Sequence, residues 1–371
     1  MMCKICYLFS MLLLVGFVAS CGSSQVQDTT VPLYIGTYTS GSSEGIYMAR
    51  FDTVSGKADN LQLLASVDNP SFLTLDANGK LLFAVSEHTN NKPNLYSLHR
   101  GRSWELADSL ATGALASCYV SIVGKEMLAI ANYVSGDVSF VSFNNKGRFI
   151  DEVAVFKHVG SGANAARQEA PHAHAIVADK EGRFVYAADL GIDKVMIYER
   201  VADTFVPAGE LVAAPGAGPR HIAVHPQEKI LAVINELNLT IDFYLKDERG
   251  AFTIYHSTVS LLGDEHDNGN SAADIHFSPD GRFLYGSVRG ADKIVIFQVF
   301  DGDDLNVRHR GDVSEGINWP RNFTIDPNGR FLLVANQNGN SVVVLHRDAE
   351  TGMLRPSGHR LEVSMPVCLK F

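Results

Sequence analysis

The chain has 371 residues, with 31 Lys and Arg against 41 Asp and Glu, which gives a net charge of -10. An acidic chain without a basic run lacks the clustered cations that phosphate contacts require, so nucleic acid is not an expected partner. Hydrophobic residues make up 46% of the sequence, enough for a large core, and no linker-like stretch divides it into two domains.

The first twenty residues read as an export signal and not as part of the fold. Lys4 precedes an apolar stretch from 7 to 18 that is too short to span a bilayer. Val18-Ala19-Ser20-Cys21 then matches the bacterial lipoprotein cleavage pattern, although an ordinary signal peptide could also end near a cysteine. We expect signal residues 1–20, acylation of Cys21, a tether over 21–31, and a bacterial lipoprotein in the periplasm or at the outer membrane.

Only Cys118 and Cys368 remain after the predicted signal and its acylated cysteine. Neither stands in a CxxC spacing, so we expect no zinc or other metal site, no cofactor and no disulfide.

Internal repeats determine the predicted fold. Six similar segments begin at Pro70, Ser117, Pro171, Pro219, Ala272 and Pro320, and a seventh start, PVCLKF, begins at Pro366. Successive starts are 47, 54, 48, 53, 48 and 46 residues apart, a period that suits one four-stranded propeller blade.

Each repeat follows one pattern: an alternating strand, a turn such as Asp326-Pro327-Asn328-Gly329, and a more continuously apolar strand from Phe331. Leu33–Tyr38 and 45–51 resemble the second and third strands of a blade whose first strand is PVCLKF. Joining them closes a ring without an open sheet edge. We therefore predict an all-β, seven-bladed β-propeller over residues 32–371, without helices and as a monomer.

The first strand of a blade lines the central channel, and the second returns antiparallel beside it. The residue after each repeat start and the end of each second strand should therefore meet at one mouth of the channel. The first set comprises Ser71, Cys118, His172, Arg220, Ala273 and Arg321, and the second comprises Glu87, Asn132, Tyr133, Asp189, Asn235, Glu236, Arg289, Asn336 and Gln337. Turn and apolar positions recur between repeats whereas these positions vary, which indicates function. The longer loops over 158–170 and 262–271 should cover the same mouth.

Each candidate also has a structural explanation. Arg220 and Arg321 could bind carbonyls or an acid at a blade junction, and Glu236 could simply pair with Arg220. Arg289 is a similar case, and Arg167 could be a loop contact or solvated surface. His172 and His174 share a strand face, a spacing that also suits a metal, although no nearby carboxylate completes such a site.

The strings GSGANAARQEAPHAH, GPRHIAVHP, VINE, SPDGRFLYGSVRG and DPNGRFLLVANQ resemble the propeller-type lactonases, a family that contains bacterial 6-phosphogluconolactonases and the fungal carboxy-muconate lactonising enzyme. The likeness extends from Leu33 to Phe371. It implies a metal-independent site that uses His172, Arg220, Glu236 and Arg289. The expected substrate contacts are Arg321, His221, His174, Glu87, Asn132, Gln337 and Arg167.

This resemblance implies hydrolysis of a small anionic sugar lactone. Glu236 would take the proton from water and His172 would protonate the ring oxygen, or the two roles would be exchanged, while arginines stabilise the oxyanion and clamp the anionic group. The alternatives are a lactonising or cycloisomerase reaction on a muconate-like dicarboxylate, and a non-catalytic propeller that binds a glycan or protein. A phosphogluconolactone is a cytosolic metabolite whereas this chain carries an export signal, so the substrate stays open.

Overall fold

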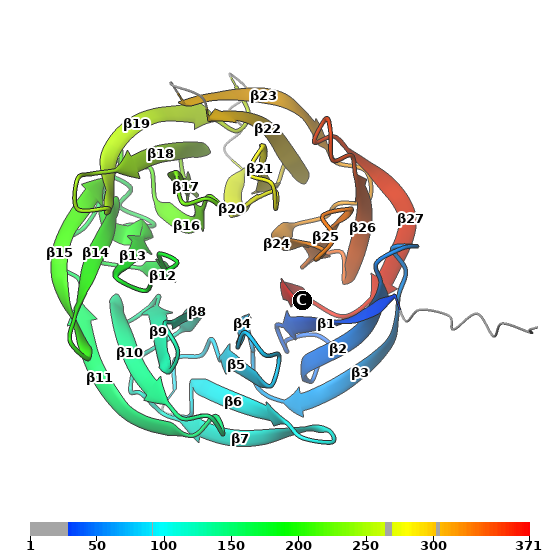
Figure 1. Ribbon diagram of the computed structural model, residues 1–371, viewed down its shortest axis with the longest axis horizontal. Coiled ribbons are helices and arrows are strands. Elements are labelled where there is room, and N and C mark those ends of the chain that lie inside the picture. The colour runs from blue at the N-terminus through cyan, green and yellow to red at the C-terminus, as the bar shows by residue number, and fades with distance from the viewer. Residues whose placement is uncertain (1–28, 91, 264–268, 302–304) are drawn as a thin grey trace, which may run out of the picture.

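The computed structural model describes residues 29–90, 92–263, 269–301 and 305–371, which form seven four-stranded antiparallel sheets around a central axis (Figure 1). The prediction of an all-β, seven-bladed propeller is confirmed. A single 3₁₀ turn, η1 (Leu190–Ile192), is the only helical element in these ranges, and none of their helices could cross a membrane. The predicted signal and Cys21 lie outside the described residues.

Each blade consists of four strands that are consecutive in the sequence, except the first, which takes its innermost strand from the C-terminus. Blade 1 contains β28 (Pro366–Lys370), β1 (Thr30–Thr37), β2 (Gly45–Asp52) and β3 (Ala58–Ser66); blade 2 contains β4 (Phe72–Leu75), β5 (Leu81–Val85), β6 (Leu95–Arg100) and β7 (Trp104–Leu110). Blade 3 contains β8 (Ser117–Val123), β9 (Met127–Asn132), β10 (Asp137–Phe143) and β11 (Phe149–Lys157); blade 4 contains β12 (Ala173–Ala178), β13 (Phe184–Asp189), β14 (Lys194–Val201) and β15 (Thr204–Val212). Blade 5 contains β16 (Pro219–Val224), β17 (Ile230–Asn235), β18 (Thr240–Lys246) and β19 (Phe252–Ser260); blade 6 contains β20 (Ser271–Phe277), β21 (Phe283–Arg289), β22 (Lys293–Asp301) and β23 (Leu305–Val313); blade 7 contains β24 (Pro320–Ile325), β25 (Phe331–Asn336), β26 (Ser341–Arg347) and β27 (Leu354–Glu362).

The two ends of the chain close the ring. Strand β28 lies beside β1, as Figure 1 shows, with Tyr34 opposite Lys370 and Gly36 opposite Cys368. The pairing confirms the prediction from PVCLKF. Both Cys118 and Cys368 are buried free thiols.

The predicted turn after the first strand forms as the sequence indicates. In blade 7 the Asp326 carboxylate accepts the N–H groups of Arg330 and Phe331, each at 2.6 Å. Gly329 takes a positive φ of 68°, which glycine adopts without the steric penalty of a Cβ. These turns lie at the end of the channel away from the predicted site.

The hydrophobic core lies between neighbouring blades. Phe184 and Tyr186 of blade 4, for example, pack in one buried cluster with Leu231, Tyr244 and Phe252 of blade 5. Because each sheet buries both faces against its neighbours, the inner strands are held at fixed positions around the axis.

Halfway along the inner strands, one residue from each blade contributes to a layer that we call the central layer. Its members are Phe72, Tyr119, Ala175, His221, Asp274, Asn322 and Cys368. The ring of His221, from blade 5, lies 5.3 Å from Tyr119 in blade 3 and 6.0 Å from Phe72 in blade 2. Contacts between blades that are not neighbours must cross the axis, so the central layer fills the channel.

The central layer also ties consecutive blades together. The Asp274 carboxylate accepts the Phe323 N–H of the next blade at 3.1 Å, and Asn322 Oδ1 accepts the Leu369 N–H of the following one at 2.7 Å. The thiol sulfur of Cys368 then accepts the Leu73 N–H at 3.3 Å. Hydrogen bonds of this kind satisfy inner-strand backbone groups that have no further strand to pair with.

We expect Asn322→Ala to destabilise the ring by about 2–4 kcal/mol, because it leaves the Leu369 N–H without its acceptor and removes a donor from the buried Asp274 carboxylate. Equilibrium urea unfolding measures this change. The exposed Asn338→Ala variant should lose less than about 0.5 kcal/mol. Equal losses in the two variants would contradict this role.

Candidate active site

The charged mouth of the channel lies where the inner strands begin, and blade 4 enters it differently from the prediction. Strand β12 starts at Ala173, which pairs with the last residue of β13, two residues later than Pro171 indicates. His174, and not His172, therefore takes the position that Arg220 has in blade 5. The longer loop before β12 carries a proline of its own, and this proline was mistaken for the start of the repeat. His172 lies just before the strand, at the end of the loop.

Glu236, directly after β17, is the centre of the charged mouth. Its Oε2 lies 2.9 Å from Nε of Arg220 and 2.9 Å from Nη2 of Arg289, and its Oε1 lies 2.6 Å from Nη2 of Arg167. These arginines come from β16, from β21 and from the loop before β12. The Glu236 side chain is only 5% exposed, so the structure brings four predicted residues together around one buried carboxylate.

The arginines decide the charge of Glu236. Burial alone would raise the pKa of this carboxyl, but the charges of Arg289, Arg220 and Arg167 outweigh burial and lower the pKa to about 2. Burial and the neighbouring Arg289 and Arg321 in turn lower the pKa of Arg220 to about 9, against the attraction of Glu236. At neutral pH Glu236 is a carboxylate with a low affinity for a proton.

The two buried arginines are held by backbone carbonyls as well. Arg220 Nη1 donates to the carbonyl of Ala273 at 2.5 Å, and Arg289 Nη2 donates to that of Ala272 at 3.0 Å. The Nε–H of Arg220 is close to Glu236 but is not aligned with it, and neither Nε has a hydrogen-bond acceptor among the described residues. Both guanidinium groups are fixed in place and keep unused donors.

A second ion pair lies beside this cluster. Arg321 Nη2 is 3.8 Å from Oε2 of Glu87, and the hydroxyl of Tyr38 donates to the same oxygen at 2.8 Å. The Arg321 guanidinium also lies over the Tyr38 ring, 5.2 Å from its centroid. Arg321 and Glu87 thus belong to the mouth, as predicted.

His172 is oriented by a carbonyl. Its Nδ1 donates to the carbonyl of Tyr133 at 2.9 Å, and its ring stacks on the Tyr133 ring with centroids 4.5 Å apart. The other ring nitrogen, Nε2, lies 3.3 Å from Oε1 of Glu169. Tyr133 also receives a long 3.5 Å contact from Arg167, which connects His172 to the Glu236 cluster.

The loop that carries Arg167 is anchored at both ends. His158 Nδ1 lies 2.6 Å from Oδ2 of Asp189, and the other oxygen of that carboxylate accepts the His172 N–H at 2.7 Å. Gln168, fully buried, donates to the carbonyl of Leu190 at 2.8 Å. The position of Arg167 over Glu236 is therefore built into the loop.

Gly191 allows this anchorage. A Cβ on Gly191 would come within 1.9 Å of the carbonyl oxygen of Ala170 and 2.8 Å of the His172 nitrogen. Any other residue would push the loop and His172 away from η1.

His174 and His221 form the floor of the mouth. Burial, together with the charge of Arg220, lowers the pKa of His174 well below its usual range and that of His221 to about 3. His221 donates from Nδ1 to Oδ1 of Asp274 at 2.7 Å. Both imidazoles are neutral at neutral pH, which fits a wall of the site better than proton transfer. The described residues contain no group of three His, Cys, Asp or Glu side chains placed to hold a metal.

Asn132 does not serve the mouth as predicted. Its amide is fully buried, accepts the Ser117 hydroxyl at 2.6 Å and donates to Asp137 at 2.7 Å, so its hydrogen bonds are used within blade 3. Asn235 and Asn336 occupy the same strand position in blades 5 and 7. That recurrence identifies a structural residue and was visible in the sequence.

Gln337 follows Asn336 at the mouth and is half-buried. Its Nε2 makes a 3.5 Å contact with Asn338, and its Oε1 has no hydrogen-bond partner among the described residues. This oxygen is itself buried, and no hydrogen bond or ion pair among the described residues joins Gln337 to the arginine cluster, so the structure does not support the predicted substrate contact.

Three residues at or beneath the mouth were missed. Tyr38 holds the position in blade 1 that Glu87 and Glu236 hold in theirs, but that blade is divided between the chain ends. Glu169 stands in the loop, outside the repeat. Asp274 is an acid within a strand that is otherwise largely buried, and this was the available signal.

The model of the lactonase family, described as a 7-bladed β-propeller, matches residues 32–371. The chain belongs to this family. A 6-phosphogluconolactonase of Bacillus subtilis is 35% identical over 91% of this chain and 97% of its own length. The resemblance to propeller-type lactonases is thereby confirmed.

Solved structures agree. A Bacteroides fragilis protein solved as a candidate 6-phosphogluconolactonase has a TM-score of 0.86 at 32% identity, covering 93% of this chain and 99% of its own. The Pseudomonas aeruginosa periplasmic gluconolactonase PpgL has a TM-score of 0.83 at 29% identity, covering 92% and 99%.

The depressed pKa of Glu236 predicts how its contribution to stability depends on pH. The unfolded chain restores the ordinary pKa of 4.5, so the ionised carboxylate stabilises the fold above that pH, and this contribution is lost as the pH falls towards 2. The difference in unfolding free energy between wild type and Glu236→Gln should shrink by about 2 kcal/mol from pH 5 to pH 3. Urea unfolding at each pH measures it, with the exposed Glu105→Gln variant as control. A difference that stays constant or widens would contradict the ion-pair geometry.

Proposed function

We propose that this lactonase-family chain hydrolyses a small sugar lactone that carries a negative charge, as the name of its Bacillus subtilis relative indicates for that protein. The observation that carries the proposal is the buried carboxylate of Glu236 held by three arginines beside a carbonyl-oriented histidine. Arginines outnumber carboxylates in this cluster, which suits an anionic substrate.

The arginines of the mouth differ in how exposed their side chains are, and this difference indicates different roles. The Arg167 side chain is 42% exposed and that of Arg321 is 16% exposed, whereas Arg220 is 2% exposed. Arg167 is therefore the residue best placed to give up its ion pair with Glu236 and bind the phosphate or carboxylate of a substrate. Its guanidinium group can make two parallel hydrogen bonds to such a group. Arg321, which pairs with Glu87, is the next most exposed arginine of the mouth.

Arg220 and Arg289 suit stabilisation of the oxyanion. Water that attacks a lactone carbonyl creates negative charge on its oxygen, and donors fixed beforehand stabilise that charge by about 3 kcal/mol each. Both guanidinium groups are held by carbonyls and by Glu236, so they need no reorganisation when the charge appears. Glu236 thus acts as the anchor that orients them.

His172 is the better candidate for proton transfer. Its Nδ1–H is fixed by the Tyr133 carbonyl, so Nε2 can take the proton of the attacking water. The resulting imidazolium would lie beside Glu169 and could then protonate the ring oxygen as the C–O bond breaks. Glu236, strongly stabilised as a carboxylate, is a weak base, and this reverses the first assignment of roles made from the sequence.

The expected place of action rests on the N-terminal sequence. The cleavage pattern before Cys21 supports a lipid-anchored protein outside the cytoplasm, and the Pseudomonas aeruginosa neighbour is named a periplasmic protein. The wild-type protein expressed in a Gram-negative host should begin at Cys21 and carry the added mass of its acyl chains, and a Cys21→Ser variant should lack both. Mass spectrometry of the intact proteins measures this, and a wild-type protein without the acyl mass would exclude the anchor.

We expect the purified protein to hydrolyse δ-gluconolactone or its 6-phosphate. His172→Gln should lower kcat by about 10²–10⁴-fold with little change in KM, because it removes a proton acceptor and no binding charge. Glu236→Gln should change kcat and KM together, because the arginines lose their anchor. A pH-stat assay measures both, with the exposed His256→Gln variant as control.

If His172→Gln keeps full turnover, the base is not His172. Turnover of carboxymuconolactone alone would favour a lactonising enzyme, and absence of turnover with every lactone would overturn the hydrolase proposal.

Charge recognition is tested separately. Arg167→Met should raise KM for the 6-phosphate by about 10–100-fold, the value of one charge-assisted contact, and raise that for the neutral lactone much less. Arg183, which pairs with Glu199 on the surface, supplies the matched control Arg183→Met. Equal effects of Arg167→Met on the two substrates would show that Arg167 does not read the anionic group.

A further inference from the structure

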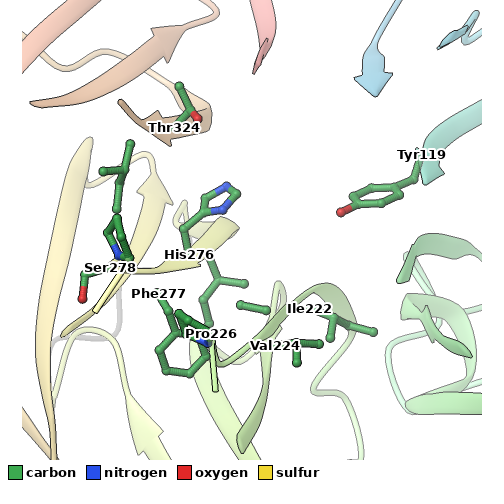
Figure 2. A pocket seen from close by; sticks show the side chains of 12 residues that line it. Tyr119, Ile222, Val224, Pro226, His276, Phe277, Ser278 and Thr324 are labelled. Carbon is green, nitrogen blue, oxygen red and sulfur yellow. The ribbon is translucent and has the colours of Figure 1, made fainter. Parts of the chain in front are cut away.

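The opposite end of the channel, which we call the far mouth, contains a cavity of about 360 Å³. It lies where the inner strands end, between blades 5, 6 and 7. Its lining includes Tyr119, Ile222, Val224, His276, Phe277 and Thr324. Figure 2 shows the Tyr119 hydroxyl and the His276 ring pointing into the same space from opposite sides.

On each inner strand, we compare the residue two positions beyond the central layer. This residue is polar in five of the seven blades: Thr74, Ser121, His276, Thr324 and Lys370. Strands β20, β24 and β28 are neighbours in the ring, so His276, Thr324 and Lys370 follow one another around the far mouth. This set contains two potential cations and no carboxylate.

Lys370 has no ion pair within the described part of the chain. Its Nζ lies 4.5 Å from the centroid of the Phe72 ring, and that ring stacks on Tyr119 at 3.9 Å. The ammonium group therefore lies against the ring of Phe72, and the stacking partner of that ring, Tyr119, lines the cavity. A cation–π contact of this kind leaves the ammonium's N–H donors free for an anion.

A residue of the central layer fixes the orientation of the His276 ring. Its Nε2 donates to Oδ2 of Asp274 at 2.9 Å, and its side chain is 35% exposed. Asp274 is buried and also binds His221 and Asn322, so its charge is satisfied inside the protein and does not face the cavity. The other edge of the His276 ring is left for a ligand.

The central layer separates the far mouth from the charged mouth. Phe72, His221, Asp274 and Asn322 are each no more than 5% exposed. Phe72 contacts His221 across the axis, and Asn322 donates to Asp274 of the neighbouring blade. A ligand in the far mouth therefore cannot touch Glu236 or its arginines.

We propose that the far mouth binds a small oxyanion, either a phosphate group or a carboxylate, between Lys370, Thr324, His276 and the Tyr119 hydroxyl. Lysine supplies the charge, and the hydroxyls donate to oxygens of the anion. Because the Nε2–H of His276 is already donated to Asp274, His276 donates to the anion from Nδ1 only as an imidazolium. The apolar walls of Ile222, Val224 and Phe277 accommodate the carbon part of an organic anion. This proposal does not depend on the lactonase activity.

The test follows the imidazole signals of His276 by two-dimensional ¹⁵N–¹H NMR, assigned by their loss in His276→Gln. Inorganic phosphate and gluconate are titrated in parallel, which distinguishes the phosphate from the carboxylate source. We expect a saturable shift in wild type and in Glu236→Gln, and a dissociation constant at least tenfold weaker in Lys370→Met. Lys80→Met, an exposed lysine at the same end of the molecule but in the turn before β5, should titrate like wild type.

Lys370→Arg, which keeps the charge, should retain the binding and serves as a check on folding. Lactone turnover of Lys370→Met should equal that of wild type. A His276 signal that neither anion moves, or equal dissociation constants for wild type and Lys370→Met, would overturn the proposal whatever the lactonase assay shows.

Discussion

A buried carboxylate stays ionised only when cations or hydrogen-bond donors compensate its charge, and for Glu236 three arginines meet this requirement and so organise the charged mouth. Arg220 reaches it from the inner strand of the same blade, Arg289 from blade 6 and Arg167 from the loop before blade 4. The seven-bladed ring supplies the geometry because it brings residues far apart in sequence to one end of one axis. Removal of Glu236 would leave Arg220 and Arg289, both buried, with carbonyl acceptors but without a neighbouring carboxylate.

The rigid loop before blade 4 holds Arg167 at the charged mouth, where its side chain stays accessible to a substrate. The loop over 158–170 is long, yet His158 and Gln168 tie it to Asp189 and Leu190. The arginine that meets the solvent is thus positioned by buried hydrogen bonds, while its own side chain stays half exposed. Preorganisation of this kind lowers the entropic cost of binding and of charge stabilisation in the transition state.

The repeats made the ring, its closure and most of the mouth predictable, because turns and apolar positions recur at a fixed period. Arg220, Glu236, Arg289, Arg321 and Glu87 could be found because they break that period. The prediction failed where the period itself misled. Pro171 lies in a loop and imitates a repeat start, so His172 and His174 exchanged places.

The structural role of Asn132 could be recognised from the sequence because it recurs as Asn235 and Asn336, but each stands beside a variable mouth residue and was grouped with it. Other features depend on three-dimensional contacts that no spacing reveals. The low proton affinity of Glu236 follows from its distances to three arginines, of which Arg167 is 69 positions away along the chain. The division of the channel into two mouths by Phe72, His221 and Asp274 likewise appears only when the blades are assembled.

The most direct measurement is a crystal structure of the protein with 6-phosphogluconate, the product of the corresponding lactone. We expect the phosphate on Arg167, the carboxylate against Arg220 and Arg289, and Nε2 of His172 within hydrogen-bond distance of the new carboxylate or hydroxyl. A product bound away from these groups, with Arg167 still paired to Glu236, would contradict these roles.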